Sequence, residues 1–434
     1  MGTILSCESV IKQYRQYDTV VTAVNRANFT VQDKEFVAII GASGSGKSTL
    51  LQICAGLDVP NSGRVFIRGH DLTQMSPDEL SRFRGSYTGF IFQKHNLIPQ
   101  FTALENILIP TVMCNKPDYS YEENLKKLID TLRIGDRLHH LPSELSGGQQ
   151  QRVAIARTLA PEPSVLFMDE PLSNLDAKLR LEMRYELQRL HVETGSTFVY
   201  VTHDQMEAMT LATKICLINN GVLQQYDAPL DVYNRPANLF VADFVGNPSI
   251  NFVEAKGKEQ ADGSFRFTIL DDLEATFRPN EPIDMDAWFR KRDQDAADLE
   301  AQRLEMLKDK KAVEKSNKDE VFKYHIAKVD ESDYAVEEEP EITNEDFVLA
   351  IRPEALKLSK DGSVASTIYG AMPTGMESTV KLKIGKYLLT GVIFGGVTFK
   401  LGEETGVDIA GTDILLFDRK SGKAIAAGSL SVKG

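Results

Sequence analysis

The glycine-rich stretch GASGSGKST at residues 41–49 constrains the fold of this chain more than any other feature of the sequence. It follows the apolar run EFVAII at 35–40, which predicts a buried strand, and it leads into a helical pattern. The spacing G-x-x-x-x-G-K-[ST] in this setting is typical of a phosphate-binding loop, where backbone N–H groups and a helix start converge on phosphate oxygens. The sequence therefore predicts a layered α/β domain with a nucleotide site.

Each residue type in this loop suits a separate task in holding a triphosphate. Glycine lets the backbone curl around the phosphates, and Gly41, Gly44 and Gly46 are expected to do so. The Lys47 ammonium group should reach the outer phosphates, and the Ser48 hydroxyl should bind Mg²⁺. The predicted nucleotide contacts in this loop are Gly41, Ala42, Ser43, Gly44, Ser45, Gly46, Lys47, Ser48 and Thr49.

A second apolar run, SVLFMDEP at residues 164–171, ends in two carboxylates. It predicts a buried strand that delivers Asp169 to its carboxyl end, where the side chain can orient Mg²⁺ directly or through water. Glu170 follows immediately and is the natural general base for an attacking water molecule. Together with the glycine-rich loop, these carboxylates predict hydrolysis of a nucleoside triphosphate.

Two further polar side chains follow predicted strands, and each has two interpretations. His203 ends the run STFVYVTH at 196–203, where an imidazole could touch a γ-phosphate, although a lone histidine is more often structural. Gln93 follows the run TGFIF at 88–92, where its amide could sense Mg²⁺ or water, or could simply lie on the surface. The residues alone leave both alternatives open.

The stretch ELSGGQQQRVAIARTL at 144–159 places a second glycine turn at the start of a helical pattern. A glycine turn that opens a helix also suits phosphate, because hydroxyl and backbone N–H groups gather there. The chain already has a phosphate loop about a hundred residues earlier, so the second turn requires a different role. Its candidate contacts are Ser146, Gly147, Gly148 and Gln149.

The order of predicted strands and helices along the sequence indicates two domains. Short β-branched runs alternate with helical stretches up to about residue 240, and two successive helical patterns at 119–160 indicate an inserted helical subdomain. After residue 247, strand-like pieces joined by Gly and Asn turns predict a small all-β barrel or sandwich. We therefore predict a nucleotide-binding domain over 1–245, with a helical subdomain at about 94–160, and an OB-like β-domain over 246–434.

A charged acidic segment at about 283–345 interrupts the predicted β-domain. Residues 281–350 hold 21 Asp and Glu against 11 Lys and Arg, which argues against nucleic acid as a partner of this segment. A solvated helix followed by a partly disordered acidic loop is the favoured interpretation, and a dedicated binding element is the alternative. The expected apolar stripe of this helix is narrow and consists of Ala297, Ala301, Leu304 and Leu307.

The motifs taken together resemble the ATP-binding-cassette ATPases over residues 1 to about 245. The glycine-rich loop, Gln93, LSGGQ, MDEP, SNLD at 173–176 and His203 occur in this order, and LSGGQ separates this family from other phosphate-loop NTPases. The resemblance implies that the nucleotide is ATP and that His203 touches its γ-phosphate. The catalytic residues that follow are Lys47, Gln93, Glu170 and His203, with Ser48, Gln93 and Asp169 around Mg²⁺.

The same resemblance implies a role for the second glycine turn. In this family two cassettes stack head to tail, and each LSGGQ loop closes over the ATP that the other cassette holds. One cassette per chain then implies a dimer, most simply a homodimer, with Ser146 facing the partner's ATP and Asp176 at the seam. Adenine stacks on an aromatic residue in this family, and Tyr14 is favoured over Tyr17 by position.

Two resemblances bear on the type of transporter, and they point to different types. Residues 221–252, 349–359 and 415–425 are similar to the maltose-type sugar importer ATPases and their C-terminal regulatory domain, whereas residues 86–110 are more like lipoprotein-release and macrolide-efflux cassettes. We expect the ATPase of a carbohydrate importer, with export or lipoprotein release as the alternative. A non-transport cassette protein lacks support, since the sequence shows neither a long coiled coil nor a second cassette.

The expected partners follow from that choice. Integral-membrane permease subunits should contact the chain near Gln93 and residues 94–110, and a solute-binding protein should take part indirectly. No apolar run reaches the roughly 18 residues of a membrane span, so no membrane-spanning helix is expected. The resemblance to importer ATPases then implies a peripheral protein at the cytoplasmic face of the membrane. The β-domain should serve regulation and dimer contact.

Overall fold

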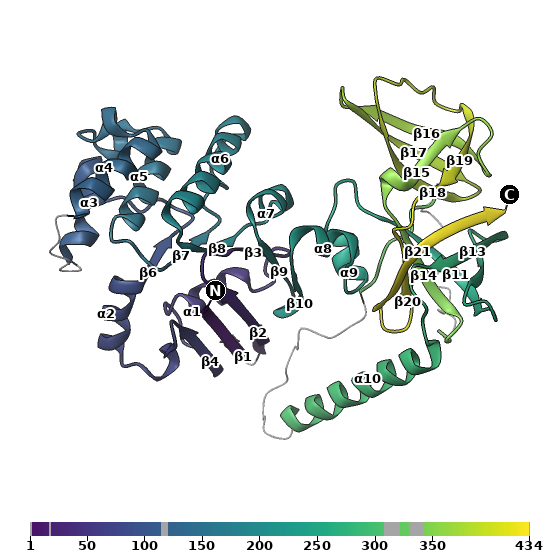
Figure 1. Cartoon of the computed structure of the whole chain (residues 1–434), viewed down its shortest axis with the longest axis horizontal. Coiled ribbons are helices and arrows are strands. Elements are labelled where there is room, and N and C mark those ends of the chain that lie inside the picture. Colours follow the sequence, from purple (N-terminus) through teal and green to yellow (C-terminus); the bar gives the residue numbers. More distant parts are fainter. Residues whose placement is uncertain (1, 17–18, 114–119, 308–321, 330–341, 434) are drawn as a thin grey trace. The chain divides into compact units, whose positions relative to one another are not determined.

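The computed structural model describes residues 2–16, 19–113, 120–307, 322–329 and 342–433. The chain divides into two compact units, one of residues 1–229 and the other of residues 230–307 with the described residues from 322 onward (Figure 1). This division lies earlier in the chain than the expected boundary at 245/246, which stays a prediction because a compact unit is not by itself a functional domain. Among the described residues, no helix has both the length and the apolar character that crossing a membrane requires.

A six-stranded sheet forms the centre of the first unit, in the order β10-β9-β3-β8-β7-β6. Its strands β9, β3, β8, β7 and β6 run parallel, and β10 is antiparallel to β9. Every residue of β3 and β8 is buried, as expected for apolar runs covered on both faces. The four strands expected from the sequence are confirmed. The bounds are β3 Phe36–Ile40, β6 Thr88–Ile91, β7 Val165–Asp169, β8 Thr197–Val201, β9 Lys214–Asn219 and β10 Val222–Asp227.

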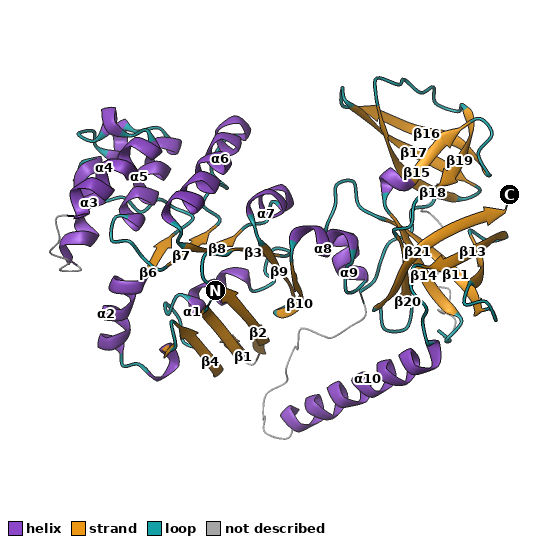
Figure 2. Ribbon diagram, in the orientation of Figure 1, coloured by secondary structure: helices purple, strands orange, loops and turns teal. Residues whose placement is uncertain are grey.

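A second, antiparallel sheet of the first unit has the order β2-β1-β4-β5. Helix α1, Lys47–Cys54, lies between the two sheets, and its Leu50 and Leu51 are buried in a core that both sheets share (Figure 2). The helix that follows the glycine-rich loop is therefore held by packing on two sides. The bounds are β1 Thr3–Gln16, β2 Thr19–Gln32, β4 Ser62–Ile67 and β5 His70–Asp71.

Helices complete the first unit, and three of them form the expected helical insertion. Helices α4 and α5 match the two helical patterns of residues 119–160, and α3 precedes them. A second apolar core joins these helices to α6 and the outer face of the large sheet. The bounds are α2 Pro77–Tyr87, α3 Ala103–Met113, α4 Ser120–Leu132, α5 Gly147–Leu159, α6 Ala177–Thr194 and α7 Gln205–Leu211, with 3₁₀ turns at Leu72–Gln74, Gly135–Arg137 and Pro142–Glu144.

The second unit is mostly β-structure, which confirms the expected all-β domain. A closed barrel has the order β11-β12-β13-β21-β20-β14, and beside it lies a five-stranded sheet in the order β15-β19-β16-β17-β18. The barrel strands are β11 Asn251–Glu259, β12 Phe265–Ile269, β13 Leu273–Pro279, β14 Asp346–Ile351, β20 Ile414–Asp418 and β21 Ala424–Lys433. After a 3₁₀ turn at Pro353–Ala355, the sheet contains β15 Leu356–Ser359, β16 Val364–Pro373, β17 Glu377–Ile384, β18 Tyr387–Phe394 and β19 Glu404–Ile409.

Two short helices at the start of the second unit, α8 Pro229–Asn234 and α9 Leu239–Phe244, are fixed to the barrel by Arg352. This arginine is buried, and its guanidinium group donates to the carbonyl oxygens of Tyr233 at 2.6 Å and of Ala242 and Val245. A cation suits these carbonyls because they lie at helix C-termini, where the peptide dipoles leave negative potential. The contacts explain why α8 and α9 pack with the β-structure.

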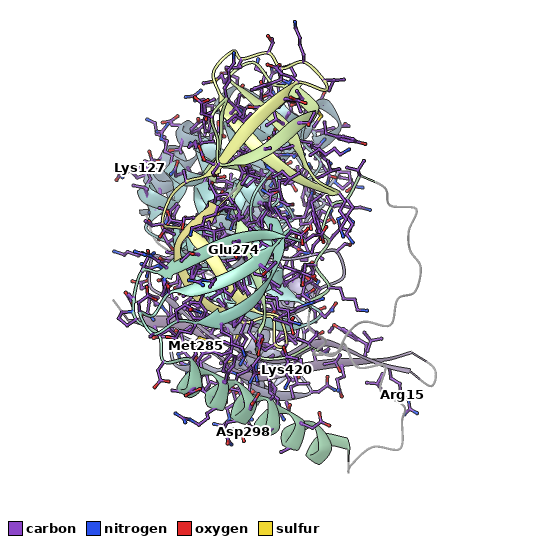
Figure 3. All side chains as sticks on the ribbon, turned by 90° about the vertical axis from the view of Figure 1, so that its right-hand side faces the viewer. Arg15, Lys127, Glu274, Met285, Asp298 and Lys420 are labelled. Carbon is purple, nitrogen blue, oxygen red and sulfur yellow. The ribbon has the colours of Figure 1, made fainter. Side chains whose placement is uncertain are left out.

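The acidic segment begins with helix α10, Met285–Leu307, whose first half packs against the barrel. Met285 is buried in the barrel core, and Arg292 is buried with its Nη1 at 3.0 Å from Oδ1 of Asp418. Figure 3 labels Met285 at the start of α10 and Asp298, which is exposed, farther along. The solvated helix that the composition predicts is therefore found after these packed turns, where residues 296–301 are exposed.

The narrow apolar stripe that the sequence indicates on α10 is exposed in the part that can be tested, as the favoured interpretation of a solvated helix requires. Ala297 and Ala301 are exposed, and the side chains of Leu304 and Leu307 lie outside the described residues. The packed face comes earlier and consists of Met285, Trp288, Phe289 and Arg292. Alanine side chains bury little apolar surface, so the larger side chains at the start of the helix decide which face packs.

Residues 322–329, which we call the strap, also belong to the acidic segment. Phe322, Tyr324 and Ile326 alternate along the strap and pack against a core formed by α9 and the barrel. The N–H of Leu388 donates to Ala327 O at 2.8 Å, so the strap continues along the edge strand β18. Both described ends of the acidic segment thus pack on the β-structure, a packing that its composition did not reveal.

Candidate functional site

The glycine-rich loop is held by close backbone contacts that only glycine permits. A Cβ atom on Gly41 would lie 2.1 Å from Ile218 O, and one on Gly46 would lie 2.0 Å from Ala23 O. Gly46 also has φ 99°, in the left-handed region, where it caps the N-terminus of α1. The loop therefore reaches the start of α1 with its shape fixed before any ligand binds.

Two polar side chains inside this loop fit a bound phosphate. The Ser45 side chain is buried, and its hydroxyl has no hydrogen-bond partner within the described part of the chain. Lys47 is buried too, and its Nζ donates to Gly41 O at 3.1 Å and to Ala42 O at 2.8 Å. Burial lowers the pKa of Lys47, while the nearby carboxylates of Glu170 and Asp169 act in the opposite direction. An anion in the loop would give the Ser45 hydroxyl a partner and the Lys47 ammonium group a counter-charge.

Ser48 and Asp169 form the candidate magnesium site. The Ser48 hydroxyl, in the first turn of α1, donates to Oδ1 of Asp169 at 2.8 Å, where β7 ends. Burial raises the pKa of Asp169, so a cation beside this carboxylate would relieve an unfavourable charge. Among the described residues, no group of three or more His, Cys, Asp or Glu could hold a metal. This donor set fits Mg²⁺, which binds few protein oxygens and takes the rest from water and phosphate.

Glu170 and His203 face each other across the ends of two neighbouring strands. Oε2 of Glu170 lies 3.2 Å from Nδ1 of His203, whose side chain is the more exposed of the two. Glu170 has φ 45°, a left-handed conformation that costs free energy in a residue other than glycine. Its backbone N–H donates to Val201 O at 3.0 Å, which fixes this turn to β8. The expected general base therefore lies beside the expected γ-phosphate contact.

Gln93 reaches the same place through the segment 173–176, which we call the SNLD loop. Nε2 of Gln93 lies 3.4 Å from the Ser173 hydroxyl, which in turn donates to Glu170 O at 2.9 Å. Asn174 donates to Gln93 O at 3.1 Å. Asp176 caps α6, because its Oδ1 accepts from the N–H of Leu179 at 3.0 Å. The loop thus connects Gln93 to the backbone of Glu170.

The LSGGQ turn lies at the start of α5 and is built as a helix cap. The Ser146 hydroxyl accepts from the N–H of Gln149, whose side chain accepts from the N–H of Ser146 at 2.9 Å. Gly148 packs against Leu179, where a Cβ would approach within 2.5 Å, while a Cβ on Gly147 would meet Leu175 Cδ2 at an ordinary 4.0 Å. No hydrogen bond or ion pair between described residues joins this turn to the glycine-rich loop. The structure therefore assembles every other part of the site but leaves 146–149 apart.

Tyr14, the residue expected to stack on adenine, is half exposed on β1. Its hydroxyl donates to Oδ2 of Asp58 at 3.0 Å, and Nζ of Lys12 lies 5.2 Å from the centre of its ring. Burial raises its pKa, and the Thr49 side chain contacts it. Tyr14 is thus placed next to the end of the glycine-rich loop, with its ring held in position. Tyr17 lies outside the described residues.

Sequence reasoning missed the residues that support this site from behind. Arg157 on α5 donates to His95 O at 2.8 Å and to Asn96 O at 2.7 Å, which ties the segment after Gln93 to the LSGGQ helix. Ser173 and Asn174 were recognised only as part of the SNLD motif, without a role of their own. No local pattern marks their contacts with the segment around Gln93, because these partners are 61 to 81 positions away in the chain.

A glycine-rich loop, a hydroxyl–carboxylate pair and a glutamate next to a histidine at adjacent strand ends define a phosphate-loop ATPase. A family model described as "ABC transporter" matches residues 24–173. The chain belongs to the ABC transporter family. Within that family it is an ATP-binding, ATP-hydrolysing subunit.

Three relatives show the extent of the similarity. The osmoprotective compounds uptake ATP-binding protein GgtA of Synechocystis sp. is 41% identical over 256 residues, 59% of this chain and 68% of its own. The trehalose/maltose import ATP-binding protein MalK of Thermococcus litoralis is 41% identical over 58% of this chain and 68% of its own. The sn-glycerol-3-phosphate import ATP-binding protein UgpC of Pectobacterium atrosepticum is 40% identical over 62% and 73%.

Proposed function

We propose that the residues gathered at the ends of β3, β7 and β8 bind and hydrolyse MgATP. The glycine-rich loop and Lys47 hold the phosphates, and Ser48 with Asp169 holds Mg²⁺, assisted by Gln93. When bound, Mg²⁺ neutralises charge on the phosphates. Glu170 accepts the proton of the attacking water, and His203 orients Glu170 and the γ-phosphate. The contact of 3.2 Å between Glu170 and His203 carries this proposal.

The experiment that tests this site is the substitution Glu170→Gln. The amide keeps the size of the side chain and its approach to His203 but cannot take a proton, so turnover should fall by about 10²–10⁴-fold. Binding of ATP, measured by isothermal titration calorimetry, should change little. The exposed pair Arg189 and Glu193 provides the control, and Glu193→Gln should leave turnover unchanged. Near-normal hydrolysis by Glu170→Gln would exclude Glu170 as the base.

The separation of the LSGGQ turn from the glycine-rich loop supports a composite site built from two chains. In a head-to-tail homodimer, Ser146 and Gly147 of one cassette meet the ATP held by the other, with Asp176 at the seam. The variant Ser146→Arg blocks that approach. The variant Lys47→Ala weakens the binding of phosphate by the glycine-rich loop. When the two defective chains are mixed, one composite site has both defects and the other has neither. Hydrolysis should therefore recover in the mixture, whereas no recovery would contradict a shared site.

The cargo we propose is a carbohydrate or a similar polar solute taken into the cell. The relatives named above serve uptake of osmoprotective compounds, trehalose or maltose, and sn-glycerol-3-phosphate. Export or lipoprotein release is the second candidate, because residues 86–110 are similar to cassettes of those systems. Uptake of radiolabelled maltose by vesicles that contain the chain and its permeases would support import. Release of substrate without uptake would support the second candidate.

The proposed membrane partner contacts the segment that follows Gln93. A hollow of about 400 Å³ opens there between residues 94–99 and the 3₁₀ turn before the LSGGQ helix, with Gln150 and Asn174 in its wall. Ile98 and Phe101 expose apolar surface next to it. Permease subunits that dock in this hollow would place the chain at the cytoplasmic face of the membrane, as a peripheral subunit. The β-domain would then regulate the ATPase and add to dimer contact.

A further inference from the structure

A buried carboxylate next to His203 has no task in the chemistry proposed above. Glu207 on α7 is only 3% exposed, and its Oε2 accepts from the Tyr200 hydroxyl and from the Thr202 hydroxyl, each at 2.7 Å. The Thr202 hydroxyl in turn accepts from the N–H of Asp204 at 3.0 Å. The residues on both sides of His203 are therefore connected to Glu207, which fixes the backbone that carries the imidazole.

Arg180 on α6 connects this carboxylate to the SNLD loop. Its Nη2 donates to Leu175 O at 3.1 Å, within the loop. Its Nη1 lies 3.7 Å from Oδ2 of Asp204, and its Nε lies 4.0 Å from Oε1 of Glu207. One guanidinium group thus spans from the SNLD loop to the residues that hold His203.

Arg180 makes a hydrogen bond to Leu175 O but only longer contacts to Asp204 and Glu207. The bond to Leu175 O has hydrogen-bond length, but 4.0 Å to Glu207 exceeds it by about an ångström. Nε of Arg180 is buried and has no hydrogen-bond partner in the described ranges of the chain. A small displacement of Leu175 would therefore let Arg180 close on Glu207, because an unpaired buried N–H gains from such a bond.

We infer that Arg180 is a positioning residue that couples the SNLD loop to His203. The inference rests on the proposed function, in which that loop lies at the seam between two cassettes. When the second cassette packs against the loop, Leu175 O and the guanidinium group move together. Arg180 then tightens on Glu207 and Asp204, which draws the backbone on both sides of His203 into the position required beside Glu170.

The test measures kcat and KM for ATP in the full chain. Arg180→Met removes the connection but keeps the apolar part of the side chain, so kcat should fall about ten- to a hundredfold while KM changes less than about threefold. Arg189 is the matched control, since it lies on the same helix and its ion pair with Glu193 is exposed. Arg189→Met should keep kcat within about twofold, and an equal loss there would overturn the inference.

A double-mutant cycle shows whether Arg180 acts through His203. In a His203→Ala background, Arg180→Met should add less than about a threefold loss, because the group it positions is gone. A full additional loss in that background overturns the coupling alone. Normal hydrolysis by His203→Ala by itself instead removes His203 from the proposed site. The two failures are therefore distinguishable.

Arg180→Lys keeps the inference testable if the methionine variant does not fold. Lysine retains the positive charge but has one nitrogen in place of the fork, so it cannot bond Leu175 O and face Glu207 and Asp204 together. This variant should fold and should still lose kcat by at least about fivefold. Full activity of Arg180→Lys would show that the bridge is not required.

Discussion

The buried ion pair between Arg292 and Asp418 should decide how firmly the acidic segment is held. Arg292 is 4% exposed and Asp418 is fully buried, and Nη2 of Arg292 also donates to Oδ1 of Asn344 at 3.0 Å. One guanidinium group thus joins the first turns of α10, the end of the acidic segment and the end of β20. Arg292→Met removes these bonds while keeping much of the packed volume.

The expected loss in the free energy of unfolding is near 3 kcal/mol. Removing one partner of a buried pair costs about 3–5 kcal/mol, because the other charge stays buried and uncompensated. Asp418 keeps two further donors, the N–H of Ser421 at 2.8 Å and the Ser421 hydroxyl, which places the loss at the lower end of that range. In the double variant with Asp418→Asn, part of the lost free energy of unfolding should be restored, because no buried charge is then left without a partner.

Urea unfolding followed by tryptophan fluorescence measures this loss directly. Trp288 is the single tryptophan of the chain and lies on α10, one turn before Arg292. Lys423→Met is the control, because Lys423, which directly precedes β21, forms an ion pair with Asp295 on the same helix as Arg292, and both side chains of this pair are nearly half exposed. That change should cost less than about 1 kcal/mol. A loss below about 1 kcal/mol for Arg292→Met would refute the reasoning.

Two further predictions concern the magnesium site and the acidic segment. Burial raises the pKa of Asp169, so the charged carboxylate destabilises the nucleotide-free fold above that pKa. The variant Asp169→Asn should therefore unfold at a higher urea concentration than the wild type at pH 7. This difference should shrink as the pH falls toward 4 and the carboxyl group of the wild type becomes protonated. An equal difference at both pH values would contradict this. Replacing residues 300–321 with a short Gly/Ser linker should leave basal ATPase and the Trp288 transition nearly unchanged, whereas replacing the strap residues Phe322, Tyr324 and Ile326 with serine should lower the transition midpoint. Equal midpoints for the two variants would show that the strap adds no stability.

Much of the site could be predicted from the sequence because its residues follow strands. A parallel sheet brings the carboxyl ends of its strands to one edge, so Ser48, Asp169, Glu170 and His203 had to meet once the strands were recognised. The LSGGQ turn was recognised by resemblance alone, and its partner is not in the same chain under the proposed function.

The remaining parts depend on contacts between distant residues of unrelated appearance. Arg292 and Asp418 are 126 positions apart, and each looks like an ordinary surface charge in a charged stretch. Arg180 looks like any helix-surface arginine until Leu175 O, Asp204 and Glu207 surround it. The packed face of α10 was missed because periodicity marks a possible face, whereas the size of the side chains decides which face packs.

The strap has a consequence for how this protein behaves at high concentration. β18 is the last strand of the five-stranded sheet, and an open strand of that kind can pair with the same strand of another molecule. Here Leu388 N–H is bonded to Ala327 O, and Val329 N–H is bonded to Lys386 O at 3.0 Å, so part of the edge already has a partner from its own chain. The strap thereby covers part of the β18 edge, so that this part cannot pair with a strand of another molecule.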